Sequence, residues 1–438
     1  MAQQDRSLPG RAELSRHISA EEAAAATAEL VRIATVAEAG QFEAPVAELV
    51  ADWCRAEGLM PRLVEVAPGR PNMVVELAGS REGPTLLFEG HSDTVTAGDP
   101  DLWTYGPFTP KLVGDRLYGR GSCDTKGNIV AAFLAVRAVM RATGGDFPGR
   151  IRFLVPVDEE GMMTGIKAFI AAGGADDLDG AVACEPENLE ICIRQKGALR
   201  LQALVQGRMA HGAMPLTGAN PMPLLARMAL AAGDVERSEQ ERVGFDPCLG
   251  WPSVTPTELI APEHGPSGFN VVPTAGRLSI DVRTVVGQDH RALKRQLAAR
   301  LEGILREANL DLLEGHGHML RQRLEPSPAP GPYTGHLALI DDRPATETPR
   351  DHPLAAAFAG AAEQVLGRPP VYAGVPGATD ATFLWAAGVP IITTGAGDRF
   401  IPHHVDEWVG ISQLAEAANV YALGALRFLA SGFRRRRA

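Results

Sequence analysis

Short runs of apolar residues alternate with segments of helical periodicity through the first part of the chain. Residues 73–77, 85–88, 151–157 and 180–183 have the length and composition of strands that are buried on both faces. Between them, apolar side chains at helical spacing predict helices such as the one over residues 129–140. Buried strands that alternate with helices indicate an α/β fold with a mostly parallel, mixed sheet flanked by helices.

The hydrophobic pattern changes near residue 197. Residues 278–282 alternate strictly between apolar and polar, which predicts a half-buried antiparallel strand, and an amphipathic helix follows over residues 293–304. After a proline-rich stretch at 325–333 the helix-and-strand alternation returns. We therefore expect a smaller α+β domain to be inserted into the α/β domain. The predicted divisions are 1–196 and 342–438 for the α/β domain and 197–341 for the insertion.

Composition excludes several classes of protein. The formal charge is −11, which does not favour binding to a phosphate backbone, so no nucleic-acid partner is expected. No apolar run reaches about 18 residues and the first forty residues lack an apolar signal core, so we expect no membrane partner and a cytoplasmic location. The five cysteines are scattered and never spaced as CxxC. A metal site in this chain would therefore use histidine and carboxylate ligands.

Potential ligands follow four of the predicted strands. They are His91 and Asp93 after 85–88, the acidic run Asp158, Glu159 and Glu160 after 151–157, Glu185 after 180–183, and His403 and His404 beyond 390–394. A fifth carboxylate, Asp124, lies in a glycine-rich segment before a predicted helix. Because the carboxyl ends of parallel strands meet at one edge of a sheet, these nitrogen and oxygen ligands predict a site for zinc or a similar divalent ion.

Seven segments carry a resemblance to a known family. They are GHSDTV at 90–95, GRGSCDTKGN at 119–128, DEEGMMTG at 158–165, CEPE at 184–187, GRMAHGAMP at 207–215, NVVPTAGRLSIDVR at 270–283 and PHHVDEWV at 402–409. In this order they resemble the co-catalytic zinc peptidases and deacylases, which include acetylornithine deacetylase, succinyl-diaminopimelate desuccinylase, carboxypeptidase G and the aminoacylases. The resemblance implies a zinc-peptidase catalytic domain and an inserted lid and dimerisation domain.

The resemblance implies a ligand set for two zinc ions per subunit, with cobalt or manganese able to substitute. His91 and Glu185 would bind the first ion, Glu160 the second, and Asp124 both. His403 is the last ligand rather than His404, since the family places a glutamate four residues after the ligand and Glu407 stands there. The bond between Asp124 and Thr125 corresponds to a cis peptide in the family.

The resemblance also implies roles beyond metal binding. Glu159 matches the general base, and Asp93 matches the carboxylate that orients His91. In the inserted domain, Asn270 and Arg283 would hold the carboxylate of the substrate, and His211 would reach the active site of a partner subunit. Gly395 and Gly397 would add backbone N–H groups for the same carboxylate.

These roles predict a homodimeric dizinc amidohydrolase that cleaves an N-acyl amino acid or a short peptide with a free carboxylate. The related carbamoyl and allantoate hydrolases place histidine at the position of Glu185, which argues against that branch. A dipeptidase or aminopeptidase shares all the ligands and stays open, as does cleavage of a formamide. A catalytically inactive binding homologue is disfavoured because all five ligands and Glu159 are present. Residues 309–333, with His316 and His318 expected to be exposed, depart from the family pattern.

Overall fold

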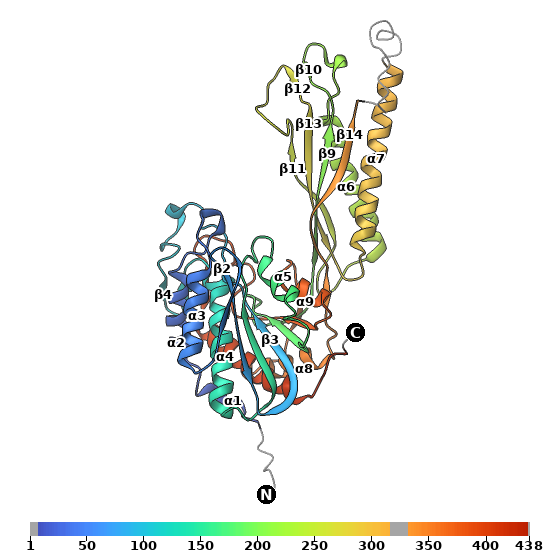
Figure 1. Ribbon diagram of the computed structural model, residues 1–438. Coiled ribbons are helices and arrows are strands. Elements are labelled where there is room, and N and C mark those ends of the chain that lie inside the picture. Colours follow the sequence, from blue (N-terminus) through green and yellow to red (C-terminus); the bar gives the residue numbers. More distant parts are fainter. Residues whose placement is uncertain (1–7, 316–331, 437–438) are drawn as a thin grey trace. The chain divides into compact units, whose positions relative to one another are not determined.

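The computed structural model describes residues 8–315 and 332–436, and Figure 1 shows its path. His316, His318 and most of the stretch that departs from the family pattern lie outside the described residues. The chain divides into two compact units. Unit 1 comprises Met1–Gln195 and Thr346–Ala438, and unit 2 comprises Lys196–Ala345.

Unit 1 contains the α/β part of the chain. Its helices and helical turns are α1 (Arg11–Ser15), α2 (Ala20–Val31), η1 (Ala37–Ala39), α3 (Ala44–Ala56), η2 (Pro100–Leu102), η3 (Ser122–Lys126), α4 (Gly127–Thr143), α5 (Thr164–Ala171), α8 (Pro353–Leu366), α9 (Ala381–Ala386) and α10 (Ile411–Ala430). Its strands are β1 (Arg62–Ala67), β2 (Arg70–Ala78), β3 (Arg81–Glu89), β4 (Lys111–Val113), β5 (Arg116–Tyr118), β6 (Pro148–Val155), β7 (Gly180–Ala183), β8 (Ile191–Gln195), β15 (Thr346–Glu347), β16 (Tyr372–Val375), β17 (Ile391–Thr393) and β18 (Trp408–Gly410).

A nine-stranded mixed sheet forms the centre of unit 1. Its strands follow the order β1-β2-β6-β3-β7-β17-β8-β15, and β16 also pairs with β8. The four central strands β6, β3, β7 and β17 run parallel to one another, whereas β1, β2, β8 and β15 join by antiparallel pairing. This arrangement confirms the predicted mostly parallel, mixed sheet.

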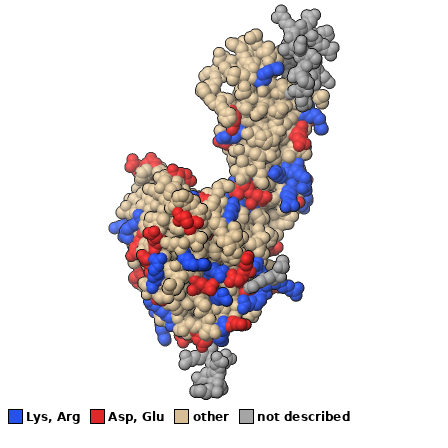
Figure 2. All heavy atoms as spheres, in the orientation of Figure 1, with Lys and Arg blue, Asp and Glu red and all other residues tan. Residues whose placement is uncertain are grey.

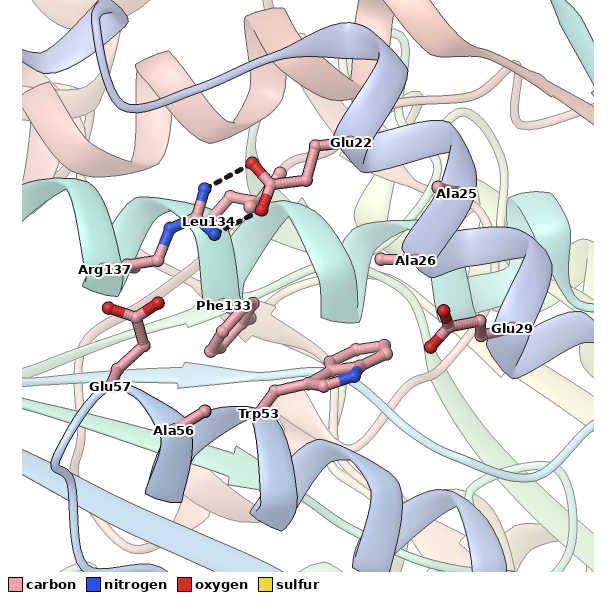
Figure 3. A pocket seen from close by; sticks show the side chains of 10 residues that line it. All are labelled: Glu22, Ala25, Ala26, Glu29, Trp53, Ala56, Glu57, Phe133, Leu134 and Arg137. Atoms are coloured by element: carbon pink, nitrogen blue, oxygen red, sulfur yellow. Dashed lines mark hydrogen bonds and ion pairs between the residues drawn. The ribbon is translucent and has the colours of Figure 1, made fainter.

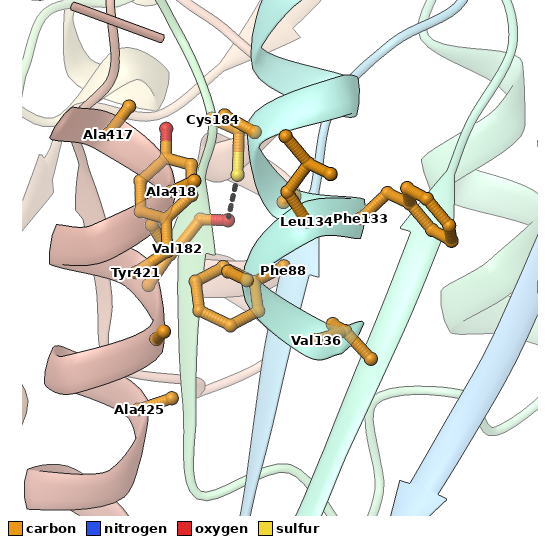
Figure 4. Packing of buried hydrophobic residues seen from close by; sticks show 14 of the residues in the cluster. Phe88, Phe133, Leu134, Val136, Val182, Cys184, Ala417, Ala418, Tyr421 and Ala425 are labelled. Carbon is orange, nitrogen blue, oxygen red and sulfur yellow. Dashed lines mark hydrogen bonds between the residues drawn. The ribbon is translucent and has the colours of Figure 1, made fainter. Parts of the chain in front are cut away.

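Helices cover both faces of this sheet because its strands are apolar on both sides. On one face, α2, α3, α4, α8 and α10 pack against side chains such as Phe88 and Phe153. On the other face, α5 and α9 pack against Leu87 and Leu154. In Figure 4, Phe88 lies between α4 and Tyr421 of α10, and the centroids of the Phe88 and Tyr421 rings are 5.3 Å apart. Tyr421 is fully buried, so its hydroxyl needs a partner, and it donates to the carbonyl of Thr394 at 2.7 Å.

Unit 2 contains a separate antiparallel sheet of order β11-β13-β9-β14, packed against two long helices. Its elements are β9 (Gly197–Gln206), β10 (Ala210–His211), η4 (Pro215–Thr217), α6 (Met222–Val243), β11 (Ser253–Ile260), β12 (Val271–Val272), β13 (Ala275–Thr284), α7 (His290–Gly315) and β14 (Thr334–Arg343). The buried and half-buried residues of β13 alternate along the whole strand, as the sequence predicted for residues 278–282. The separate α+β architecture expected for the insertion is therefore confirmed.

The surface of unit 1 carries both signs of charge. On the face in Figure 2, acidic and basic side chains lie interspersed over this unit. A hollow between α2, α3 and α4 is lined by Trp53 and Phe133, and Arg137 binds both oxygens of Glu22 beside them (Figure 3). The five cysteines form no disulfide. In the part of the chain that the structure describes, every helix is too short or too polar to cross a membrane.

Candidate metal centre

The topology of the sheet explains how the predicted ligands meet. Strands β6, β3, β7 and β17 are consecutive neighbours and run in the same direction, so their carboxyl ends lie along one edge. The segments that follow them contain Glu160, His91, Glu185 and His403 in that order across the sheet. Asp124 comes from η3, which leads directly into α4.

Asp124 lies between the two histidines. One of its oxygens, Oδ1, is 3.0 Å from Nε2 of His91, and the other, Oδ2, is 3.4 Å from Nε2 of His403. The same nitrogen of His91 is 3.8 Å from Glu185, and that of His403 is 3.0 Å from Glu160. The structure thus brings together all five residues that the sequence singled out as ligands. Their contacts form two groups that share Asp124.

The donor chemistry of this cluster fits divalent metal ions. Ligand atoms of His91, Asp124 and Glu160 all lie within 4.8 Å of one another, and imidazole nitrogen and carboxylate oxygen are ligands that zinc accepts. Burial, together with the charges of Asp124 and other nearby carboxylates, raises the pKa of Glu185 well above its usual range, although the charge of His91 opposes this. Cations bound among these carboxylates would offset their mutual repulsion.

The segment that carries Asp124 is held by Glu407. The bond between Asp124 and Thr125 is cis, as the resemblance implied. One oxygen of Glu407 accepts hydrogen bonds from the backbone N–H groups of Cys123 and Asp124 at 2.9 and 3.0 Å. The other accepts from Arg120 at 2.6 Å. The sequence singled out Glu407 only as a spacing marker. Its fully buried carboxylate positions the ligand that the two histidines share.

Asp93 connects the segments that follow β3 and β6. Its two oxygens accept hydrogen bonds from the backbone N–H groups of Glu159 and Glu160 at 3.1 and 3.0 Å. Nδ1 of His91 lies 3.0 Å from the backbone carbonyl of Asp93 and 3.5 Å from its carboxylate. The nearest acceptor for the ring of His91 is thus the backbone carbonyl of Asp93, with the carboxylate, which the sequence predicted for this role, slightly farther away. Asp93 also holds the backbone of the acidic run, which the sequence did not indicate.

Glu159 is buried beside this cluster. Burial raises the pKa of its carboxyl group well above the usual range, and the charge of His91 opposes that shift. The neighbouring residue Glu160 instead points its carboxylate to His403. The two adjacent glutamates therefore have different surroundings, which is the difference that the predicted roles of base and ligand require.

Two of the predicted substrate-binding residues lie together in unit 2. His211 is in β10, which pairs with β12 so that His211 lies opposite Val271. The backbone N–H of Gly212 donates to the carbonyl of Asn270 at 2.7 Å. Nδ1 of His211 accepts from the N–H of Ala213 at 3.0 Å, so a neutral imidazole carries its proton on Nε2. That exposed nitrogen is then a hydrogen-bond donor.

Arg283 lies elsewhere in unit 2. It is the second-last residue of β13, near the end of the strand that pairs with the start of β9. Ala275, the first residue of β13, is about 26 Å away along the strand. Its guanidinium contacts Asp281 at 2.7 Å. The structure does not bring Arg283 and Asn270 of one chain together, because the full length of the strand separates them. The prediction that both residues bind the carboxylate of one substrate therefore requires that they come from different subunits.

Gly395 and Gly397 lie in unit 1, in the segment after β17. A side-chain carbon at Gly395 would come within 2.5 Å of the backbone oxygen of Glu185, so this position requires glycine for close packing against the ligand segment. The N–H of Gly397 already donates to Gln413 at 2.9 Å. It is therefore not available to a substrate, and the expectation for Gly397 is wrong.

Residues 87–427 match the sequence pattern of peptidase family M20/M25/M40. The chain belongs to this family. It is therefore a metallohydrolase, and its relatives include desuccinylases. The succinyl-diaminopimelate desuccinylase of Methylorubrum extorquens (strain PA1) is 29% identical over 378 residues, which cover 84% of this chain and 89% of the relative. That of Methylorubrum populi is 30% identical over 360 residues, with coverage of 80% and 84%.

Solved structures show the same fold at lower identity. The di-peptidase Dug1p of Saccharomyces cerevisiae superposes with a TM-score of 0.72 at 14% identity, covering 96% of this chain and 99% of the other. Human carnosine dipeptidase 1 gives 0.70 at 18% identity, with coverage of 97% and 100%. A mixed, mostly parallel sheet with a separate antiparallel sheet is thus the fold that this chain shares with these structures.

Proposed function

We propose that this M20 protein is a two-ion amidohydrolase that cleaves an N-acyl amino acid or a short peptide with a free carboxylate. The observation that carries the proposal is the convergence of His91, Asp124, Glu160, Glu185 and His403 at one edge of the sheet. Glu159 is buried directly beside two of these residues. The desuccinylase relatives support a substrate with an acyl group on an amine.

In this proposal His91 and Glu185 would hold one ion and Glu160 and His403 the other, and Asp124 would be a ligand common to the two groups. Zinc is the proposed native metal, with cobalt or manganese able to replace it. When bound, two such ions would polarise a substrate carbonyl and lower the pKa of a water molecule.

Glu159 is the proposed general base. It takes a proton from the attacking water and returns it to the leaving amine, so one carboxylate serves both halves of the reaction. Asp93 supports this role because it holds the backbone N–H of Glu159 at 3.1 Å. Displacement of that backbone would move the carboxylate relative to the ligands.

His211 and Asn270 are proposed to act together in the active site of a partner subunit. The N–H on Nε2 of His211 would donate to the oxyanion that forms during attack on the amide. Apolar side chains are exposed around this pair, among them Met209 at 58% and the fully exposed Phe269. Few charged side chains appear at this end of unit 2 in Figure 2. Exposed apolar clusters are typical of protein interfaces, which favours a homodimer.

Arg283 is proposed to bind the carboxylate of the substrate, with Gly395 contributing a backbone N–H. A guanidinium can make two parallel hydrogen bonds to a carboxylate, which suits an anionic end group. Arg283 would then exchange its contact with Asp281 for the substrate. We further propose a cytoplasmic location, because five cysteines without a disulfide are typical of a reducing compartment.

A hydrolysis screen tests the proposed function. The zinc-loaded protein is incubated with N-acetyl, N-succinyl, N-formyl and N-aroyl amino acids and with dipeptides, and release of the free amine is measured. A Glu159→Gln preparation purified in the same way serves as the control for contaminating enzymes. Cleavage of at least one N-acyl amino acid supports the proposal. Cleavage of dipeptides alone would favour the dipeptidase alternative, and no cleavage of any compound would contradict both.

A further inference from the structure

His403 lies in a long segment without regular secondary structure. The segment begins after β17 ends at Thr393 and continues until β18 begins at Trp408. Connections of this length without helix or strand are uncommon in compact domains, and their geometry depends on side-chain anchors. The other proposed ligands that follow strands have shorter connections, since His91 and Glu185 each stand two residues after the end of a strand.

The part of this segment that follows His403 has its own anchors. Asp406 accepts hydrogen bonds from the backbone N–H and the hydroxyl of Thr104 at 2.8 and 2.7 Å. Glu407 binds Arg120 and the backbone that carries Asp124. These contacts hold the part after His403, and the guanidinium of Arg120 also lies 3.5 Å from the carbonyl of His403 itself.

Arg399 is the charged anchor of the part that precedes His403, in addition to Asn128 and Gln413, which accept from the backbone N–H groups of Ala396 and Gly397. Its guanidinium is 2.9 Å from Glu187, forms an ion pair with Glu190, and donates to the carbonyl of Gly374 at 3.3 Å. Its side chain is 17% exposed, so solvent screens these contacts less than those of a surface pair. Glu187 and Glu190 follow Glu185, and Gly374 belongs to β16. One side chain therefore ties the His403 segment to the ligand segment after β7.

We propose that Arg399 is a positioning residue for the second metal ion, which it serves by holding His403 in place against the segment that contains Glu185. The inference rests on the proposed two-ion centre. Without Arg399, the part of the segment before His403 loses its charged anchor, and ordering His403 on a bound ion then costs conformational entropy. The first ion should be spared, because His91 and Glu185 are fixed by the strands themselves and the segment after β7 keeps its backbone hydrogen bonds to Gly395.

The test compares three variants in metal binding. Arg399→Met removes the guanidinium and keeps an unbranched side chain, and Arg399→Lys restores a cation. Arg152→Met is a matched control, because Arg152 also contacts two carboxylates and one backbone carbonyl, namely Asp177, Glu76 and Gly174, and its side chain is 13% exposed. Each chelator-treated protein is titrated with cobalt, following visible absorption, and bound zinc is counted after dialysis.

The wild-type protein and the Arg152→Met control should bind two ions. Arg399→Met should bind the first ion with wild-type affinity and the second about 10- to 100-fold more weakly, and Arg399→Lys should lie between. The inference would be overturned if folded Arg399→Met bound two ions with wild-type affinity. It would also be overturned if the affinity for both ions fell by the same factor. If Arg399→Met does not fold, Glu190→Gln, which removes one partner of Arg399, is judged by the same two criteria. A wild-type protein that binds fewer than two ions would instead refute the proposed centre.

Discussion

Replacement of Asp93 by asparagine should remove the negative charge and one acceptor oxygen of this side chain while it keeps the volume. Asp93 is almost fully buried, and its two oxygens accept hydrogen bonds from the N–H groups of Glu159 and Glu160. Burial alone would raise its pKa, but hydrogen bonds from His91 and these N–H groups hold the pKa below the usual range. The asparagine side chain keeps the shape but offers one oxygen and one NH2 group. One of the two backbone N–H groups would then face another donor.

The expected effect follows from the value of the hydrogen bond that is lost. A hydrogen bond to a charged group contributes about 1.5–3 kcal/mol, and each 1.4 kcal/mol corresponds to about tenfold in an equilibrium or rate. Asp93→Asn should therefore lower activity by about 10- to 150-fold. If the N–H of Glu159 loses its partner, the loss appears in kcat. If the N–H of Glu160 loses its partner instead, the second ion binds more weakly.

Steady-state kinetics at saturating zinc, combined with a zinc titration, measure both effects. Asp115→Asn is the control, because exposed Asp115 also accepts from a backbone N–H and a side-chain donor, both of Ser412, away from the ligands. The control should retain wild-type activity. Activity of folded Asp93→Asn within about twofold of wild type would refute the reasoning that this carboxylate holds the acidic run in place.

Three further predictions concern the base, a half-buried histidine and the dimer. Glu159→Gln should keep both metals but lower kcat by about 10²-fold or more, while Glu160→Gln should weaken the second ion; the reverse pattern in metal analysis would contradict the assigned roles. His352 accepts from the N–H of Leu354 at the start of α8, and burial lowers its pKa. The unfolded chain then binds more protons than the folded chain just below about pH 6.5, so urea denaturation should show that stability falls as the pH drops through that window. The variant His352→Asn keeps a hydrogen-bond acceptor at the helix start, which is worth about 1 kcal/mol, but it should weaken the pH dependence of stability. If His352→Asn showed the same pH dependence of stability as the wild-type protein, this prediction for His352 would be contradicted. His211→Ala should be nearly inactive, yet mixed dimers with His91→Ala should recover activity; inactive verified heterodimers, or a fully active monomer, would refute the shared site.

The sequence predicted the location of the centre because the relevant signals are local. Buried strands are short apolar runs, and a histidine or carboxylate directly after such a run is visible without knowledge of the fold. Once residues 85–88, 151–157 and 180–183 are read as parallel strands, their ends must share an edge. The neighbouring order of β6, β3, β7 and β17 in the structure agrees with this prediction.

The supporting contacts could not be predicted because they join residues far apart in the chain. Glu407 binds Arg120 across 287 positions, and Arg399 binds Glu190 across 209. No periodicity or spacing marks either pair. The separation of Arg283 from Asn270 depends on the length of β13 and on the direction of the chain before it, which a list of motifs does not contain.

Metal reconstitution tests the central claim most directly. The protein is stripped with a chelator, and zinc is added back in known ratios while hydrolysis of the best N-acyl amino acid from the screen is followed. We predict that the stripped protein is inactive and that activity rises until two zinc ions are bound per chain. Full turnover by the metal-free protein, or activity that saturates at one ion per chain, would contradict the two-ion mechanism.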